Sequence, residues 1–164
     1  LKNGNRTSKK YEKLFKKIMY VFIVLIVLFV LILLIQYAVL KPYHMGVDTK
    51  VSEGEIVQGV VFEQGSRMLE ISGYAYKKGQ KIERFDSDFV LKNTETGKMY
   101  KMNTTMVKNH DLMSVDGMYD CSNAGMTAKA FISGLKEGIY EICIVYGNDG
   151  EDIFSSTGVM VEIK

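Results

Sequence analysis

Cys121 and Cys143 are the two cysteines of the chain and its most reactive side chains. In an oxidising environment outside a cell they could form a disulfide. The bridge would close a loop of about 22 residues and contribute roughly 3 kcal/mol in the chain-entropy model. Cys143, however, lies within an apolar run, where a cysteine often stays a buried thiol. The sequence leaves both alternatives open, a Cys121–Cys143 bridge or two free thiols.

Catalytic combinations with these cysteines find little support. His44 and His110 are the two histidines of the chain, which are too few for a histidine-rich zinc site. A sortase-like transpeptidase would need the residue types of His110, Cys143 and Arg84, but no arginine follows Cys143. The sequence contains no HExxH motif and no nucleophile elbow, and we interpret His110 and Asp111 as a solvated pair in a loop. We therefore expect no catalytic residues and no enzyme activity.

Acidic residues gather in two short stretches, residues 86–88 and residues 148–152. Calcium requires several oxygen ligands that converge on one point. The first stretch equally fits the polar start of a strand, and the second fits a hairpin turn. We therefore expect no metal site and no bound cofactor.

Tyrosines supply the best candidates for a binding surface, because the chain has 10 tyrosines and no tryptophan. Exported β proteins that bind sugars usually present aromatic side chains as platforms. Alternation along a strand means that roughly half of the tyrosines in strands pack in the core or against neighbouring strands. We take Tyr74, Tyr76 and Tyr119 as the candidate ligand surface.

The charge is divided unevenly along the chain. Residues 1–17 carry seven bases and one acid, residues 18–40 carry no charge, and residues 41–164 carry 14 bases and 18 acids. A basic tail ahead of an acidic body is not typical of a nucleic-acid-binding protein, which needs a basic face on its folded domain. The tail instead resembles a topology signal, and attraction to anionic lipid is the default expectation for it.

Residues 18–40 form an apolar run that predicts a transmembrane helix. At 1.5 Å per residue, 23 residues span about 35 Å, enough for a hydrocarbon core of about 30 Å. The run is longer than the core of a cleaved signal peptide, and no small-x-small cleavage site follows it. It therefore predicts an uncleaved signal-anchor that crosses the membrane once. The bases before it predict a cytoplasmic N-terminus and an extracytoplasmic C-terminal domain.

The remaining residues predict an all-β domain behind a short stalk. Residues 41–54 have few apolar side chains and no period, and residues 55–164 contain the domain. Short β-rich runs recur there with glycine-containing turns between them. The predicted strands are residues 55–62, 67–76, 88–93, 98–102, 126–133, 139–146 and 157–164. Their number and length favour an Ig-like antiparallel β-sandwich, with a small barrel as the alternative.

Several stretches of this domain resemble a membrane-anchored β-sandwich module of Gram-positive bacteria. The stretches are Ile71–Ala75, Phe89–Lys92 with the returning Tyr100, Met118–Ile132 and Leu135–Ile142. That module is associated with gene clusters for surface polysaccharides and teichoic acids. The chain departs from it at Met126, where the module has an aromatic residue. The resemblance implies a β-sandwich and a role at the cell envelope.

Together these observations predict a non-enzymatic, single-pass membrane protein of the cell envelope. Its extracytoplasmic domain would bind an envelope glycan or a partner protein during envelope assembly. The alternative is a structural or signalling subunit, docked through its helix into a larger membrane complex. A glycan-binding protein should be stabilised by its ligand, whereas a docking subunit should depend on the identity of its helix.

Overall fold

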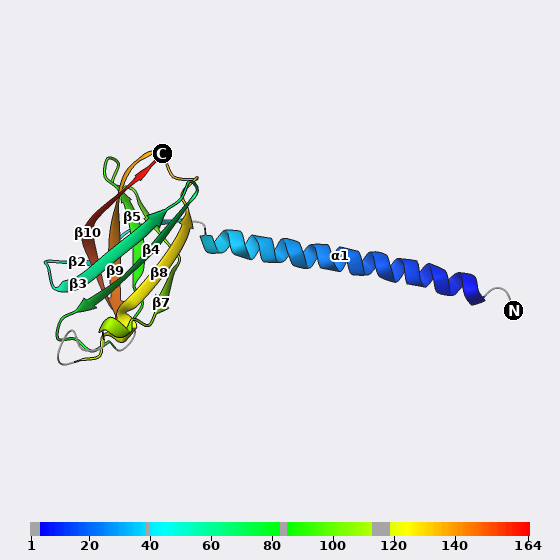
Figure 1. Cartoon of the computed structure of the whole chain (residues 1–164), viewed down its shortest axis with the longest axis horizontal. Helices are drawn as coiled ribbons and strands as arrows, with labels where there is room; N and C mark the ends of the chain where they lie inside the picture. The colour runs from blue at the N-terminus through cyan, green and yellow to red at the C-terminus, as the bar shows by residue number, and fades with distance from the viewer. Residues whose placement is uncertain (1–3, 39, 83–84, 113–118) are drawn as a thin grey trace. The chain divides into compact units, whose positions relative to one another are not determined.

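The computed structural model describes residues 4–38, 40–82, 85–112 and 119–164. The chain divides into two compact units, one that ends at Tyr37 and one that begins at Ala38. The first unit is helical and the second is built mostly from strands (Figure 1). The expectation of one apolar helix followed by a β-rich body is therefore confirmed.

The helix α1 extends from Gly4 to Ala38, so residues 4–17 of the basic tail and the apolar run form one helix. Its segment Glu12–Ile35 has a mean hydropathy of 3.6 and is long and apolar enough to cross a membrane. The predicted span, residues 18–40, reaches further than the helix does. Leu40 lies beyond the helix and packs against the core of the β body.

Within the described residues, the β body has two sheets. The six-stranded sheet has the order β1 (Lys41–Tyr43), β6 (Met99–Lys101), β5 (Asp88–Asn93), β9 (Gly138–Asn148), β10 (Glu151–Ile163) and β2 (Lys50–Val51). The four-stranded sheet has the order β3 (Ile56–Gln64), β4 (Met68–Lys77), β8 (Gly125–Phe131) and β7 (Thr104–Val107). Two 3-10 turns, η1 (His110–Leu112) and η2 (Ser122–Ala124), lie between β7 and β8.

The two sheets face each other across one apolar core. Side chains of β4 and β8 meet side chains of β5, β9 and β10 there, and the alternation along each strand selects them. On β9 the inward residues are Tyr140, Ile142, Ile144 and Tyr146, all almost fully buried. Burial of this kind contributes about 25 cal/mol for each Å² of apolar surface removed from water.

Residues 41–54, for which we expected a stalk, contribute two strands to the six-stranded sheet. β1 pairs antiparallel with β6 at one edge, and β2 pairs with β10 at the other. The β2–β10 pair is parallel, so this edge departs from the antiparallel pairing that the sequence predicts and that the other strands show. Residues 44–49 join the two edge strands. Their turn is closed by a hydrogen bond from the Thr49 N–H to the Gly46 carbonyl.

The β9–β10 hairpin is longer and its turn is tighter than the sequence pattern indicates. Asp149 and Gly150 form the turn, and both have positive φ angles, 51° and 82°. An Asp-Gly pair with this backbone is typical of a type I′ hairpin. β10 therefore begins at Glu151, whereas we expected the strand from residue 157. An irregularity between Ser156 and Val159 interrupts its pairing with β9.

Gly147 provides a test of how closely β9 packs. A Cβ atom there would lie 2.2 Å from the Asp86 carbonyl oxygen, and the Asp86 N–H already donates to the Gly147 carbonyl at 2.9 Å. Because backbone cannot move aside cheaply, Gly147→Ala should lower the free energy of unfolding by about 1–3 kcal/mol. Urea unfolding of the full-length chain in detergent micelles measures this loss. The control is Gly134→Ala, where a Cβ meets nothing within 4 Å, and equal losses in both variants would contradict the packing described.

Candidate functional site

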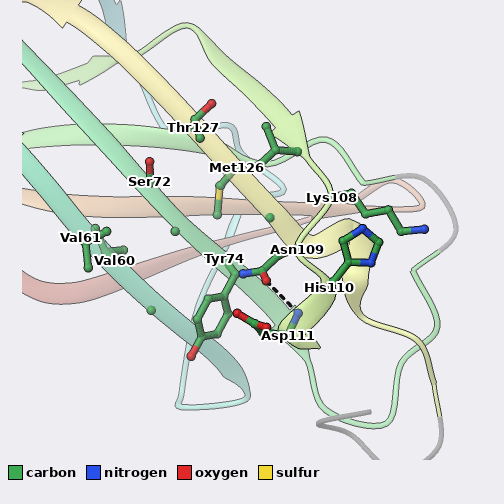
Figure 2. A pocket seen from close by; sticks show the side chains of 14 residues that line it. Val60, Val61, Ser72, Tyr74, Lys108, Asn109, His110, Asp111, Met126 and Thr127 are labelled. Carbon is green, nitrogen blue, oxygen red and sulfur yellow. Dashed lines mark hydrogen bonds between the residues drawn. The ribbon is translucent and has the colours of Figure 1, made fainter. Parts of the chain in front are cut away.

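The outer face of the four-stranded sheet carries a groove of about 610 Å³ (Figure 2). Tyr74 on β4 lies at its centre. In the register of the sheet, Gly59 on β3 and Gly125 on β8 are the cross-strand neighbours of Tyr74. Because both neighbours lack side chains, the Tyr74 ring can lie over Gly59, and Val107 and Asn109 can approach Gly125 closely. The two glycines of this cross-strand row therefore bring the tyrosine ring and the segment after β7 close to the sheet, and both line the groove.

The tyrosine ring is held in a defined position over β3. A Cβ atom at Gly59 would lie 2.6 Å from the Tyr74 ring, so the ring occupies the space that a side chain would fill. On its other side Tyr74 stacks on Tyr76, with ring centroids 6.3 Å apart. The ring is thus half-buried between β3 and Tyr76, and Tyr74 lines the groove with the part that stays exposed.

Polar side chains surround the aromatic platform. Ser72 and Thr127 occupy the next cross-strand row and line the groove with hydroxyl groups. Lys108, Asn109, His110 and Asp111 line its opposite side (Figure 2). The turn that carries them is held by the Asn109 carboxamide, which accepts the Asp111 N–H at 3.1 Å. The groove therefore offers one partly exposed aromatic ring, several hydrogen-bonding groups and charges of both signs.

The three predicted surface tyrosines have different environments. Tyr74 lines the groove. Tyr76 is only 6% exposed, because it packs with Leu112, Cys121 and Ala124 beneath the two 3-10 turns. Tyr119 is partly exposed but does not line the groove. Of the three, only Tyr74 lines the groove.

The structure does not bring the two cysteines together. Both are buried free thiols. Cys121 packs with Tyr76 near η2, whereas Cys143 packs with Val90, Val145 and Phe154 in a separate cluster. The physical reason is the alternation of β9, which turns Ile142 and Ile144 toward the core and Cys143 toward the outer face of the six-stranded sheet. Of the two alternatives, the structure contains the free thiols.

The charged residues considered for calcium or catalysis are not gathered into a site. Among the described residues, no three His, Cys, Asp or Glu side chains are placed to hold a metal ion together. Asp88 forms an ion pair with Lys101, although burial raises the pKa of this carboxyl group. His110 and Asp111 are both exposed at the groove. Arg84 lies outside the described residues.

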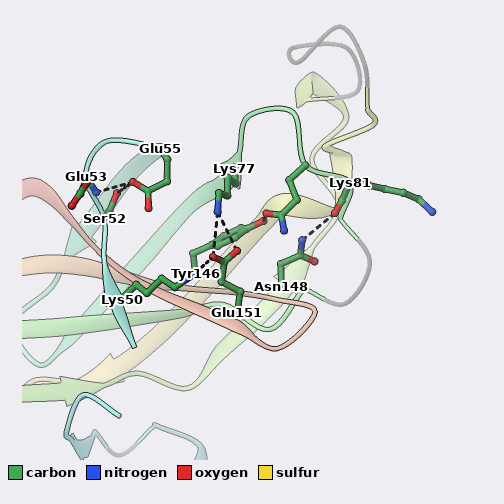
Figure 3. A network of polar contacts seen from close by, with 10 residues as sticks. Lys50, Ser52, Glu53, Glu55, Lys77, Lys81, Tyr146, Asn148 and Glu151 are labelled. Carbon is green, nitrogen blue, oxygen red and sulfur yellow. Dashed lines mark hydrogen bonds and ion pairs between the residues drawn. The ribbon is translucent and has the colours of Figure 1, made fainter. Parts of the chain in front are cut away.

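A network of polar contacts joins the two sheets at one end of the β body (Figure 3). Glu151 on β10 accepts hydrogen bonds from Lys50 on β2 at 2.9 Å and from Lys77 on β4 at 3.2 Å. These two lysines lower the pKa of Glu151. Beside it, the Asn148 carboxamide donates to the Lys81 carbonyl at 3.0 Å. This network holds the loop after β4 in place.

No protein-family model, curated protein or solved structure matches the chain in comparisons with known proteins. A function for the chain is therefore inferred from the physical properties of the groove.

The buried thiols should be inert in the folded protein. Burial, followed by the charge of Glu141, raises the pKa of Cys143 to about 12, and only the thiolate reacts readily. Iodoacetamide at pH 8 should therefore label neither cysteine in the native chain. After denaturation without reductant it should add two groups, measured by intact mass. A denatured chain that takes up no label would show a disulfide and contradict the structure.

Glu151 should make stability depend on pH. Its native pKa is lowered, so the paired carboxylate stabilises the fold above the unfolded pKa near 4.5, and the contribution is lost as pH falls through the native value. Glu151→Gln should cost up to about 1 kcal/mol at pH 7, and the difference should vanish in acid. Urea unfolding at both pH values measures this difference. The matched control is Glu162→Gln, whose ion pair with Lys164 is exposed; an equal effect there would contradict a specific role for Glu151.

Proposed function

We propose that this protein is a non-enzymatic, single-pass membrane protein whose β body is an extracytoplasmic Ig-like sandwich that binds an envelope glycan. The observation that carries the proposal is the groove around Tyr74. It combines an accessible aromatic ring with hydroxyl and carboxamide groups. A sugar ring presents apolar C–H groups on its faces and hydroxyl groups at its rim, so this combination is complementary to it.

The strand order supports the Ig-like part of the proposal. An Ig domain of the constant type pairs strands A, B, E and D in one sheet and C, F and G in the other, and variable types add C′ next to C. If β3–β10 are lettered A, B, C, C′, D, E, F and G, the four-stranded sheet has the order A-B-E-D. The central strands of the other sheet then have the order C′-C-F-G.

Tyr140 supports the same assignment. It lies near the start of β9, the strand equivalent to F, and its hydroxyl donates to the Lys136 carbonyl at 2.9 Å. A tyrosine that bonds back to the preceding corner is a feature of Ig-like domains. The usual inter-sheet disulfide has no counterpart among the described residues, since Ile142 is the neighbouring inward residue on β9 and Cys143 faces outward.

The helix supports a location at the membrane. Its apolar segment is long enough to span a bilayer, and the bases before it favour a cytoplasmic N-terminus. Anchoring would confine the body to the membrane surface and raise its effective concentration near envelope polymers. The resemblance to a module of surface-polysaccharide gene clusters is consistent with this location.

Replacing Tyr74 tests the proposed function. The full-length chain in detergent micelles would be titrated calorimetrically with defined oligosaccharides of bacterial cell walls and teichoic acids. One of them should bind, and Tyr74→Ala should weaken its binding about tenfold or more, equivalent to about 1.4 kcal/mol. The loss is expected because the ring supplies the stacking surface.

Tyr119→Ala is the matched control, because Tyr119 is a partly exposed tyrosine outside the groove. It should bind the oligosaccharide as the unmodified chain does. If no oligosaccharide binds, or if both variants bind equally well, the glycan proposal fails. The protein would then be treated as a subunit docked through its helix, and exchange of that helix for an unrelated apolar one would be the next experiment.

A further inference from the structure

β3 is an edge strand whose outer side has no neighbouring strand among the described residues. It is nine residues long and pairs with β4 throughout its length. The hairpin turn is closed by the Gly65 N–H, which donates to the Met68 carbonyl. Hydrogen-bonded pairs alternate in an antiparallel ladder, so the odd-numbered residues of β3 bond to β4. The N–H and C=O groups of the even-numbered residues, including Val60 and Phe62, therefore point toward the open edge.

Apolar side chains are exposed on both faces of this edge. Val61, on the groove face, is 69% exposed, and Phe62, on the opposite face, is 37% exposed. If a covering layer were missing, apolar side chains would be exposed on only one face of the sheet. Exposure on both faces together with an unpaired backbone is what a missing lateral neighbour leaves behind.

The other described edges are protected in ways that β3 is not. On β10, β2 pairs with Ile153 and Phe154. Further along β10, the side chains of Gln58 and Gln64 donate to the Ser156 and Glu162 carbonyls. β7 is only four residues long. Natural proteins usually protect long edges with charged side chains, above all lysine, with proline or with a bulge. β3 has no lysine, proline or bulge, and its one charged residue, Glu63, lies next to its end.

We propose that β3 pairs antiparallel with β3 of a second copy of this chain, so that two four-stranded sheets become one continuous sheet. The charge of the strand favours this partner and this direction. Glu63 is the single charged residue of β3. A parallel pair would place two Glu63 carboxylates side by side, whereas an antiparallel pair centred near Val60 places them at opposite ends, about 20 Å apart.

The pairing itself follows from the edge strand, but the longer site that it would create deepens the proposed function and rests on it, because the groove reaches the same edge. Gly59, Val60 and Val61 of β3 line the groove. Across a twofold axis the two grooves would meet at the seam and form one longer site on the same face of the sheet. Such a site fits a polymeric glycan better than a single sugar, and its ligand class is therefore an extended polysaccharide chain.

Cross-linking of the full-length chain in detergent micelles tests the pairing directly. Val61→Cys places a thiol at the seam. Ile139→Cys, on the other sheet, is the control, because Ile139 is an apolar strand residue that is 50% exposed. Cys121 and Cys143 are buried and should add little background. A short bismaleimide should convert V61C into a covalent dimer and leave I139C monomeric. Equal cross-linking of both variants would overturn the proposal.

A second pair of variants keeps the test independent of cross-linking chemistry. Val61→Lys places two like charges near the twofold axis and should return the protein mass in the micelle from dimer to monomer, measured by sedimentation. Ile139→Lys should leave the dimer intact. A monomeric unmodified chain, or a dimer that survives V61K, would overturn the pairing.

The outcome is separable from that of the proposed function. Tyr74→Ala should lose oligosaccharide binding and remain dimeric. If the chain is monomeric but Tyr74→Ala still binds the oligosaccharide less well than Tyr119→Ala does, the pairing fails and the glycan site stands. If the chain is dimeric but binds no oligosaccharide, the glycan proposal fails, and with it the longer site.

Discussion

The pairing of β9 with both of its neighbours is the constraint on which the β body depends. β9 forms long antiparallel ladders with β5 and with β10. Because the side-chain period of a strand is two, this register decides which residues enter the core. A slip by one residue would turn Ile142 and Ile144 outward and bring Glu141 inward, where an unpaired charge is very costly. The Asp149–Gly150 turn helps to hold the register, since it permits one hairpin geometry.

The four-stranded sheet differs from the six-stranded one, because its outer face contains the groove. A β-sheet normally covers its surface with alternating side chains and offers little concave space. Two glycines beside Tyr74 let its ring lie over β3 and let Val107 and Asn109 lie close to β8, and Tyr76 supports the ring from the adjacent position. The ring loses little freedom when a ligand arrives, because it is already held in place. Preorganisation of this kind reduces the cost of binding.

The sequence was sufficient for the elements with a clear period. The apolar helix and most long strands could be predicted, because their patterns extend over many residues. β1 and β2 could not, because three and two residues are too few to show alternation. Their pairing is also decided by distant strands. β7 was not predicted for the same reason. The predicted start of β10 lay too far along the chain, because the turn before it was expected to be longer.

The candidate site was harder to predict than the strands, because contacts between distant segments decide it. Tyr74 and Tyr76 are two residues apart and share one face of β4, so alternation alone could not separate them. Tyr76 is covered because η1 and η2 fold over it, and no local pattern of β4 predicts that contact. The glycines beside Tyr74 lie 15 and 51 residues away in the sequence, and only the register of three strands brings them together. Likewise, the register of β9 turns Cys143 toward the outer face of the six-stranded sheet, away from Cys121.

The open form of the groove has a consequence for how the proposed protein would bind. A shallow site on a sheet covers only part of a sugar, so a single contact would be weak. Two such sites on one continuous sheet would bind one polymer with a much higher combined affinity, provided that the polymer reaches both. Anchoring by α1 would raise this combined affinity further, because it restricts the copies to the plane of the membrane. The edge strand, the groove and the helix would then serve one purpose, the retention of a long polymer at the membrane surface through individually weak contacts.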